Sequence, residues 1–298
     1  MIHIVGAGLA GMLAGNMLIR RQPILFEQQS ELPNNHSAVL RFRSSLVSEA
    51  LGIPFKQVTM VKATAPWLNP IADTLAYSFK NTGTYRSDRS INAGSVTAQR
   101  YVAPPDLVQR MATPLEIRHN HNYSFISNNR CPVISTIPMP ALMDILEFPN
   151  KPKFIHQAGV NVHAKLQDCD AYVSLVVPDP EHPISRISIT GDDVIVECYE
   201  EKWQHDASYI VRLAAEELGI TPQHFTDAVA HRQRYAKIAP IDDRLRHDFM
   251  YWATDKHNIF SLGRFATWRP SVLMDDLVQD VRKIGRWIDQ RYDMNKSR

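Results

Sequence analysis

The first 27 residues, MIHIVGAGLAGMLAGNMLIRRQPILFE, decide the fold. Residues 2–5 are a short run rich in β-branched side chains, which predicts a buried strand. The glycine-rich stretch 6–11 reads G-x-G-x-x-G, residues 12–21 predict an apolar helix, and residues 24–27 predict a second strand that ends in an acid. A strand, glycine turn, helix and second strand in this order predict a βαβ unit with a dinucleotide site.

Each glycine of the turn has its own physical role. Gly6 permits the tight turn out of the strand, Gly8 lets the backbone approach a pyrophosphate, and Gly11 lets the helix pack closely on the sheet. Leu9 and Ala10, between the glycines, are candidate cofactor ligands, since the N-terminus of the following helix presents free N–H groups and partial positive charge to the phosphates. Glu27 follows Gly6 by 21 positions, where a carboxylate can accept hydrogen bonds from ribose hydroxyls.

A second segment near the end of the chain distinguishes between dinucleotides. Residues 258–268, NIFSLGRFATW, followed by residues 273–280, LMDDLVQD, resemble the second FAD motif of the UDP-galactopyranose mutase, protoporphyrinogen oxidase and amine oxidase families. The resemblance implies an FAD cofactor. It also implies that Gly263 and Arg264 face the pyrophosphate or ribityl chain, and that Met274 and Asp275 begin a helix aimed at the flavin pyrimidine. A helix N-terminus there stabilises the negative charge of reduced flavin.

Residues 132–140, PVISTIPMP, provide a third match. These flavoproteins often carry a similar strand beside the cofactor, which implies that Thr136 and Pro138 contact FAD. An ordinary buried strand ending at a proline is the alternative. The chain departs from the family pattern at residues 34–43, where a Gly-Gly or arginine-rich motif is common.

The matches predict an α/β fold in which a Rossmann-like FAD-binding domain carries an inserted α+β substrate domain, or cap. We expect a discontinuous FAD domain, of residues 1–50, 100–145 and 240–298, and a cap of residues 51–99 and 146–239. Within the cap, residues 184–198 predict a β-hairpin that turns at Gly191-Asp192-Asp193. Residues 206–218 predict a helix that ends at Gly219.

Two residues are candidate catalytic groups. Lys237 stands just before the chain re-enters the FAD domain, and amine oxidases often hold a water between a lysine and the flavin. His36, in a loop after two asparagines, is a candidate acid or base. A solvent-exposed side chain is the alternative for both.

Three residues are candidate substrate ligands. Arg41 and Arg43 share one face of a predicted strand and can bind a carboxylate or phosphate, with structural ion pairs as the alternative. Trp268 can flank the flavin or the substrate, and core packing is its alternative role.

Composition narrows the class of protein. Three cysteines without C-x-x-C spacing predict a reduced, cytoplasmic protein, in the host cytoplasm if the chain is viral. No apolar run predicts a membrane span or a signal peptide, and no histidine or cysteine spacing predicts a metal site. Residues 41–110 carry nine basic and four acidic residues, which either meet an anionic substrate or are scattered solvated charges.

These features predict an FAD-dependent oxidoreductase that acts on an amine or amino-acid C–N bond. Hydride passes to the flavin, the imine hydrolyses, and the net result is C–N cleavage. A narrower resemblance, to phage enzymes of thymidine hypermodification, makes a glycine-modified thymidine in DNA a candidate partner beside small-molecule amines. The alternatives are a non-redox flavoenzyme similar to UDP-galactopyranose mutase and a flavin-binding protein without turnover.

Overall fold

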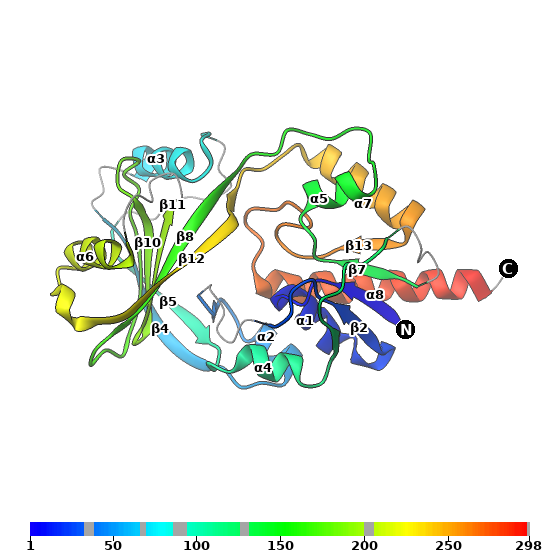
Figure 1. The fold of residues 1–298 in the computed structure, drawn as a ribbon, viewed down its shortest axis with the longest axis horizontal. Helices are drawn as coiled ribbons and strands as arrows, with labels where there is room; N and C mark the ends of the chain where they lie inside the picture. Colours follow the sequence, from blue (N-terminus) through cyan, green and yellow to red (C-terminus); the bar gives the residue numbers. More distant parts are fainter. Residues whose placement is uncertain (33–38, 66–69, 86–93, 126–130, 200–205, 297–298) are drawn as a thin grey trace.

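The computed structural model describes residues 1–32, 39–65, 70–85, 94–125, 131–199 and 206–296. Two sheets organise this part of the chain, and they lie in two lobes joined by several crossings of the backbone (Figure 1). The fold is therefore α/β, with a Rossmann-like domain and a second α+β domain, as the sequence predicts.

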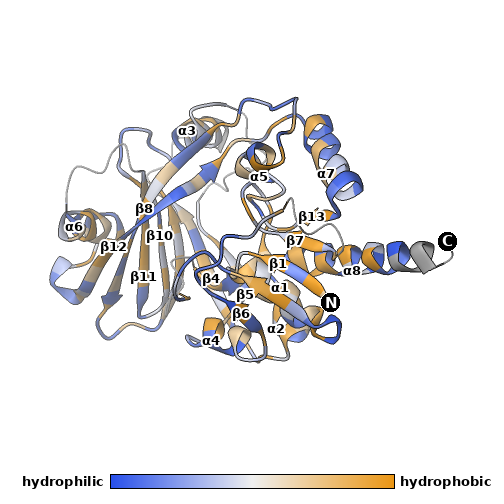
Figure 2. Cartoon of the chain, turned by 45° about the vertical axis from the view of Figure 1, so that its right-hand side comes forward, coloured by the Kyte–Doolittle hydropathy of each residue, from blue (hydrophilic) through white to orange (hydrophobic). Residues whose placement is uncertain are grey.

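The first lobe is built on a five-stranded sheet that is parallel throughout. Its strand order is β13 (Ile259–Ser261), β7 (Val133–Ser135), β1 (Ile2–Val5), β2 (Pro23–Phe26) and β6 (Glu116–Arg118). The central strands are buried on both faces, as a parallel sheet requires. Figure 2 shows the resulting concentration of hydrophobic colour around β1 and β7.

Helices cover both faces of this sheet. One face packs against α1 (Leu9–Met17), α2 (Leu46–Leu51), α4 (Leu107–Ala112) and the long α8 (Met274–Lys296). The other packs against α5 (Met139–Ile145) and α7 (Asp243–His257). Alternation along the strands decides the faces, since Ile134 joins the first core and its neighbour Val133 joins the second.

The second lobe is built on an eight-stranded sheet. Its order is β12 (Phe225–Ile238), β8 (His156–Leu166), β11 (Asp193–Tyr199), β10 (Ile184–Gly191), β9 (Ala171–Val176), β4 (Lys56–Thr64), β5 (Val96–Val102) and β3 (Arg41–Phe42). Every pair is antiparallel except β4 with β9. The predicted hairpin is confirmed in β10 and β11.

In the described part of the chain, α3 (Pro70–Thr82) and α6 (Ala207–Leu218) are the α-helices that flank the eight-stranded sheet. The predicted helix is confirmed in α6, with Asp206 as its N-cap and Gly219, at φ +67°, after its last residue. Val194 and Val196 of β11 pack under α6 with Ile210, so the odd-numbered neighbour Glu197 points to the opposite face. Alternation thus gives the sheet one apolar face and one polar face.

The two lobes meet where pairs of crossing segments hydrogen-bond to each other. Ala103 N–H donates to the Leu40 carbonyl, and Ala239 N–H donates to the Ile155 carbonyl. The structure places β3 and the last residues of β5, which the sequence groups with the FAD domain, in the eight-stranded sheet. Among the described residues, no helix is long and apolar enough to cross a bilayer.

Candidate active site

The glycine turn is held by close packing. Gly6 has φ +96°, and a Cβ on it would lie 2.1 Å from Thr136 Oγ1. A Cβ on Gly11 would lie 1.9 Å from the Gly6 carbonyl oxygen. Both glycines are therefore required by the protein itself, because the turn, α1 and the end of β7 meet without room for a side chain.

Gly8 differs from the other two glycines. A Cβ there would meet no atom of the described part of the chain within 4 Å, and its backbone, at φ −71°, suits any residue. Gly8 is the N-cap of α1 and no side chain caps the helix there, so the first N–H groups of the helix lack a capping partner among the described residues. This is the cradle that a pyrophosphate needs: free donors, a positive helix end and no side chain in the way.

Glu27 is fixed against the same turn. Its carboxylate accepts hydrogen bonds from the backbone N–H of Ala7, at 2.8 Å, and from that of Gln29, at 3.0 Å. Each carboxylate oxygen has acceptor capacity left for a ribose hydroxyl. The predicted ribose ligand thus also orders the loop that would hold the phosphates.

The C-terminal segment lies directly against this cradle. Gly263 has φ +105°, and a Cβ on it would lie 3.4 Å from Ala10 Cβ. Thr267 closes the loop by donating from its N–H and hydroxyl to the Gly263 carbonyl. Asp275, in the first turn of α8, accepts from the N–H groups of Arg43 and Ser44 at 3.2 and 2.9 Å. The start of α8 is thereby joined to the segment that carries the predicted arginines.

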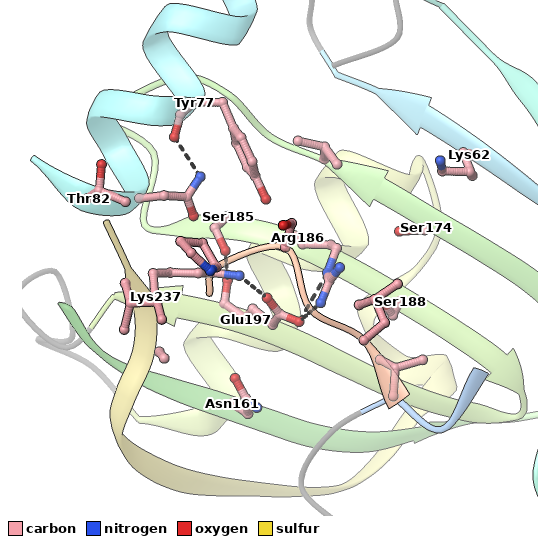
Figure 3. A pocket seen from close by; sticks show the side chains of 18 of the residues that line it. Lys62, Tyr77, Thr82, Asn161, Ser174, Ser185, Arg186, Ser188, Glu197 and Lys237 are labelled. Carbon is pink, nitrogen blue, oxygen red and sulfur yellow. Dashed lines mark hydrogen bonds and ion pairs between the residues drawn. The ribbon is translucent and has the colours of Figure 1, made fainter. Parts of the chain in front are cut away.

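A cavity of about 710 Å³ lies between the polar face of the eight-stranded sheet and the segments 39–43 and 264–273. Segment 264–273 connects Gly263 to α8, so the cavity opens beside the proposed flavin end of the cradle. Of the residues that the structure describes, seven cationic side chains and one carboxylate line it, a formal net charge of +6: Arg41, Arg43, Lys62, Arg100, Arg186, Lys237, Arg264 and Glu197. Figure 3 shows part of this lining.

Four of these residues, Arg41, Arg43, Lys62 and Arg100, form what we call the cation end. Among the described residues no carboxylate lies within ion-pair distance of any of the four. Burial, followed by the charges of Arg100 and Arg43, lowers the pKa of Lys62. Burial and the charge of Arg43 lower the pKa of Arg100. The cations thus repel one another, and a bound anion would relieve that repulsion.

Arg41 is the most enclosed member of the cation end. One Nη donates to the carbonyls of Val173, at 2.9 Å, and Ile189, at 2.7 Å, which hold the guanidinium between β9 and β10. Burial, reinforced by Arg186, lowers the pKa of Arg41 to about 10. The side chain stays protonated at neutral pH, so it presents a desolvated positive charge to the cavity.

Ser188 lies on the same wall. Its hydroxyl is buried, and no described residue hydrogen-bonds to it. A buried hydroxyl is normally satisfied, and a ligand oxygen in the cavity can provide the missing partner.

The other end of the cavity contains an ion-paired cluster that we call the clamp: Arg186, Glu197 and Lys237. Glu197 accepts from Lys237 Nζ at 2.7 Å and from Arg186 Nε at 3.0 Å, and Arg186 also donates through Nη2. Burial alone would raise the pKa of Glu197, but Arg186 and Lys237 outweigh it and hold that pKa well below its usual range. The charge of Glu197 in turn raises the pKa of Arg186.

Replacing Glu197 with Ala should lower the free energy of unfolding by about 2 to 4 kcal/mol, because it leaves two largely desolvated cations without their anion. Removing Glu116, which pairs with Arg118 on the surface, should cost less than about 1 kcal/mol. Urea unfolding at pH 7 measures both. Equal losses in the two variants would contradict the structural role of the clamp.

The ion pairs of Glu197 should also make the free energy of unfolding depend on pH. Since the pKa of Glu197 is lowered in the folded state, its stabilisation is present above its ordinary value of 4.5 and is lost as the pH falls below it. The difference in unfolding free energy between the wild type and Glu197→Gln should therefore shrink from pH 7 to pH 3. A difference that stays constant over this range would rule out the ion pair as its source.

The structure brings most of the predicted site residues together. Arg41, Arg43, Lys237 and Arg264 line the cavity. Pro138 precedes α5, and the following N–H, of Met139, donates to the Phe265 carbonyl beside the Gly263 loop. Trp268 lies elsewhere: it is 1% exposed, packs in the core and donates from Nε1 to the Ala239 carbonyl. His36 falls outside the described residues.

Sequence reasoning did not single out Lys62 and Arg100 within the basic stretch 41–110, and it missed Arg186 and Glu197. A signal for the last two was present. In the predicted hairpin a lone arginine and a lone glutamate interrupt apolar strands, and the two face each other in the register of β10 with β11. Charged residues on an apolar strand pair indicate an internal ion pair or a site.

Comparison with known proteins identifies the fold. No family model and no curated protein sequence matches the chain. A solved structure of reduced UDP-galactopyranose mutase matches it with a TM-score of 0.70 at 14% identity, over 97% of this chain and 95% of that one. A geranylgeranyl bacteriochlorophyll reductase-like protein from Thermoplasma acidophilum matches with a TM-score of 0.56 at 11% identity, over 99% and 79% of the two chains.

A third match is 2-methyl-3-hydroxypyridine-5-carboxylic acid oxygenase, with a TM-score of 0.52 at 11% identity, over 99% of this chain and 91% of that one. An aklavinone-11 hydroxylase solved as a complex with FAD matches with a TM-score of 0.51. The chain therefore has the fold of the FAD-binding flavoproteins.

Proposed function

We propose that this chain is an FAD-dependent enzyme whose substrate carries phosphate groups. The observation that supports this proposal most strongly is the clustering of four basic side chains at the cation end. No carboxylate of the described residues pairs with any of them: Arg41, Arg43, Lys62 and Arg100. One carboxylate on an amino acid would balance only part of the net charge of +6 that the described lining residues carry, whereas a diphosphate or a short stretch of nucleic acid brings several negative charges.

FAD binding rests on the residues of the cradle. The α1 N-terminus and Gly8 would hold the pyrophosphate, Glu27 the adenosine ribose, and the α8 N-terminus the flavin pyrimidine. Bound FAD supplies hydride or electron-pair chemistry that no side chain provides. The residues around it bind and orient the substrate.

The reaction that the cavity supports best is a redox-neutral rearrangement of a nucleoside-diphosphate sugar, as in the mutase whose fold extends over almost the whole chain. The cation end would bind the diphosphate. Side chains that donate to and accept from sugar hydroxyls line the rest of the cavity: Tyr77, Ser78, Asn81, Thr82, Asn161, Ser185 and Tyr199. A sugar is neutral and rich in hydroxyls, so it matches this lining.

Turnover of UDP-galactofuranose under anaerobic conditions tests this proposal. With FAD reduced by dithionite, chromatography should detect UDP-galactopyranose, and the oxidised protein should be inactive. The flavin should be as reduced at the end of the reaction as at the start. Failure of the reduced protein both to bind and to convert any nucleoside-diphosphate sugar would overturn the proposal.

The second candidate is oxidation of a C–N bond, with glycine-modified thymidine in DNA as the substrate. It is favoured by the same basic cavity, which suits DNA phosphates, and by Lys237, which lines the cavity where a lysine-held water is expected. The substrate carbon would lose hydride to FAD, and water would convert the imine to an aldehyde and a free amine. Anaerobic mixing of oxidised protein with amines, amino acids and the modified oligonucleotide should then bleach the flavin, whereas a mutase substrate leaves it yellow.

A further inference from the structure

The cavity has two ends of different electrostatic character. The cation end carries four basic side chains without an ion-pair partner among the described residues, while at the clamp Glu197 engages both neighbouring cations. Figure 3 shows Glu197 between Arg186 and Lys237, with Lys62, Ser174 and Ser188 on the other side of Arg186. This asymmetry does not follow from cofactor binding, because the clamp belongs entirely to the eight-stranded sheet.

We propose that Glu197 is a specificity-determining residue, which keeps anionic groups out of the clamp end and so fixes one orientation of the substrate. The inference rests on the proposed function, since it presumes a phosphate-bearing ligand at the cation end. The role of Glu197 narrows the proposed substrates to one class: molecules with their negative charge at one end and a neutral, hydroxyl-bearing part at the other.

The geometry of Glu197 gives the physical reason. Its side chain is 13% exposed. Its two oxygens accept hydrogen bonds from Lys237 Nζ and from the Nε and Nη2 of Arg186. A phosphate that approached either cation at hydrogen-bond distance would lie close to this carboxylate in a poorly solvated site, where repulsion between like charges is strong. The remaining N–H groups of both cations can still donate hydrogen bonds to neutral hydroxyl oxygens.

Hydroxyl and amide side chains lie beside the clamp, and one cation, Lys80, lies near them: its Nζ donates to the carbonyls of Val177 and Ile184 and lies 6.0 Å from the centroid of the Tyr199 ring. The Ser185 hydroxyl donates to the Glu197 carbonyl, and the Tyr199 hydroxyl donates to Asn81 Oδ1. Asn81 lies in α3, so this network joins the helix to the sheet beside the clamp. Ordered hydroxyl and amide groups of this kind select a hydroxylated ligand by hydrogen bonding.

Calorimetric titration of the FAD-loaded protein with inorganic pyrophosphate tests the inference. We expect one site per chain in the wild type. Glu197→Gln removes the repelling charge and should add a second site, at least tenfold tighter than any secondary binding to the wild type. The double variant Glu197→Gln with Lys237→Met lowers the positive charge again and should return to one site. One site of unchanged affinity in Glu197→Gln would overturn the inference.

Lys237→Met alone provides a test that does not depend on the folding of Glu197→Gln. Lys237 forms an ion pair with Glu197 and is not expected to contact a bound anion. This variant should therefore bind one pyrophosphate with an affinity within about twofold of the wild type. Loss of pyrophosphate binding in Lys237→Met would also overturn the inference. A wild type that binds no pyrophosphate would instead count against the phosphate-bearing substrate, and a site gained in Glu197→Gln would still support the role of Glu197.

Discussion

Replacing Gly8 with Val is expected to weaken FAD binding at least about 100-fold, equivalent to about 2.7 kcal/mol, while the free protein stays folded. A Cβ at this position would meet no atom of the described residues within 4 Å, and the backbone conformation suits any residue. The space that it would fill is the approach to the α1 N-terminus, where the pyrophosphate belongs. Fluorescence titration with FAD measures the affinity, and the unfolding temperature of the free protein should change by no more than about 3 °C.

Gly11→Ala is the matched comparison. Its Cβ would lie 1.9 Å from the Gly6 carbonyl oxygen, so this smaller change should destabilise the free protein itself. The two variants thus separate a glycine needed by the ligand from one needed by the fold. Normal FAD affinity in Gly8→Val would mean that the open space beside α1 is not the phosphate site.

A second large loss of affinity, for inorganic pyrophosphate, is expected when a basic residue of the cation end is replaced. Lys62→Met should lower the affinity for inorganic pyrophosphate about 10- to 100-fold, the loss of one or two charge-assisted hydrogen bonds. The same change removes a cation that Arg100, Arg43 and Arg186 repel, and this repulsion contributes to the lowered pKa of Lys62. The unfolding temperature of the ligand-free protein should therefore rise, by about 1 to 3 °C.

Opposite signs in the two measurements distinguish a binding residue from a structural one. Lys165 is the control lysine, because it lies in the same sheet but pairs with Asp192 at 3.0 Å and Asp193 at 2.9 Å. Lys165→Met should leave pyrophosphate affinity unchanged and should not raise the unfolding temperature. A Lys62→Met protein that is less stable and binds pyrophosphate normally would show that Lys62 has a structural role.

The cradle could be predicted from the sequence because its determinants are local. Gly6, Gly8 and Gly11 lie within six positions, and the strand and helix on either side are encoded by neighbouring residues. The Gly263 segment was recognised by its resemblance to known flavoproteins, and its packing against Ala10 agrees with the predicted meeting of the two chain ends.

The cavity could not be predicted in the same way, because its residues come from strands whose pairing is non-local. Lys62 of β4 and Arg100 of β5 meet Arg186 of β10 only through the strand order of the eight-stranded sheet. Basic charge between residues 41 and 110 was visible in the sequence, but its convergence on one cavity depends on tertiary structure.

Trp268 illustrates a different difficulty. An aromatic residue in a cofactor motif can face a ligand or the core, and the sequence does not distinguish the two. Here the residue adopts φ +46° and its indole packs against Phe154 and Tyr235, with the N–H satisfied by a backbone carbonyl. The position of Trp268 depends on where the segments around Ile155 and Ala239 meet, and that meeting is a property of the whole fold.

We expect the N-terminal glycine turn and the start of α8 to hold one flavin together. The most direct test is the absorption spectrum of the purified wild-type protein after incubation with excess FAD and removal of the unbound cofactor. The protein should then show flavin bands that correspond to one FAD per chain. A protein that passes through this treatment without visible absorption would contradict this expectation.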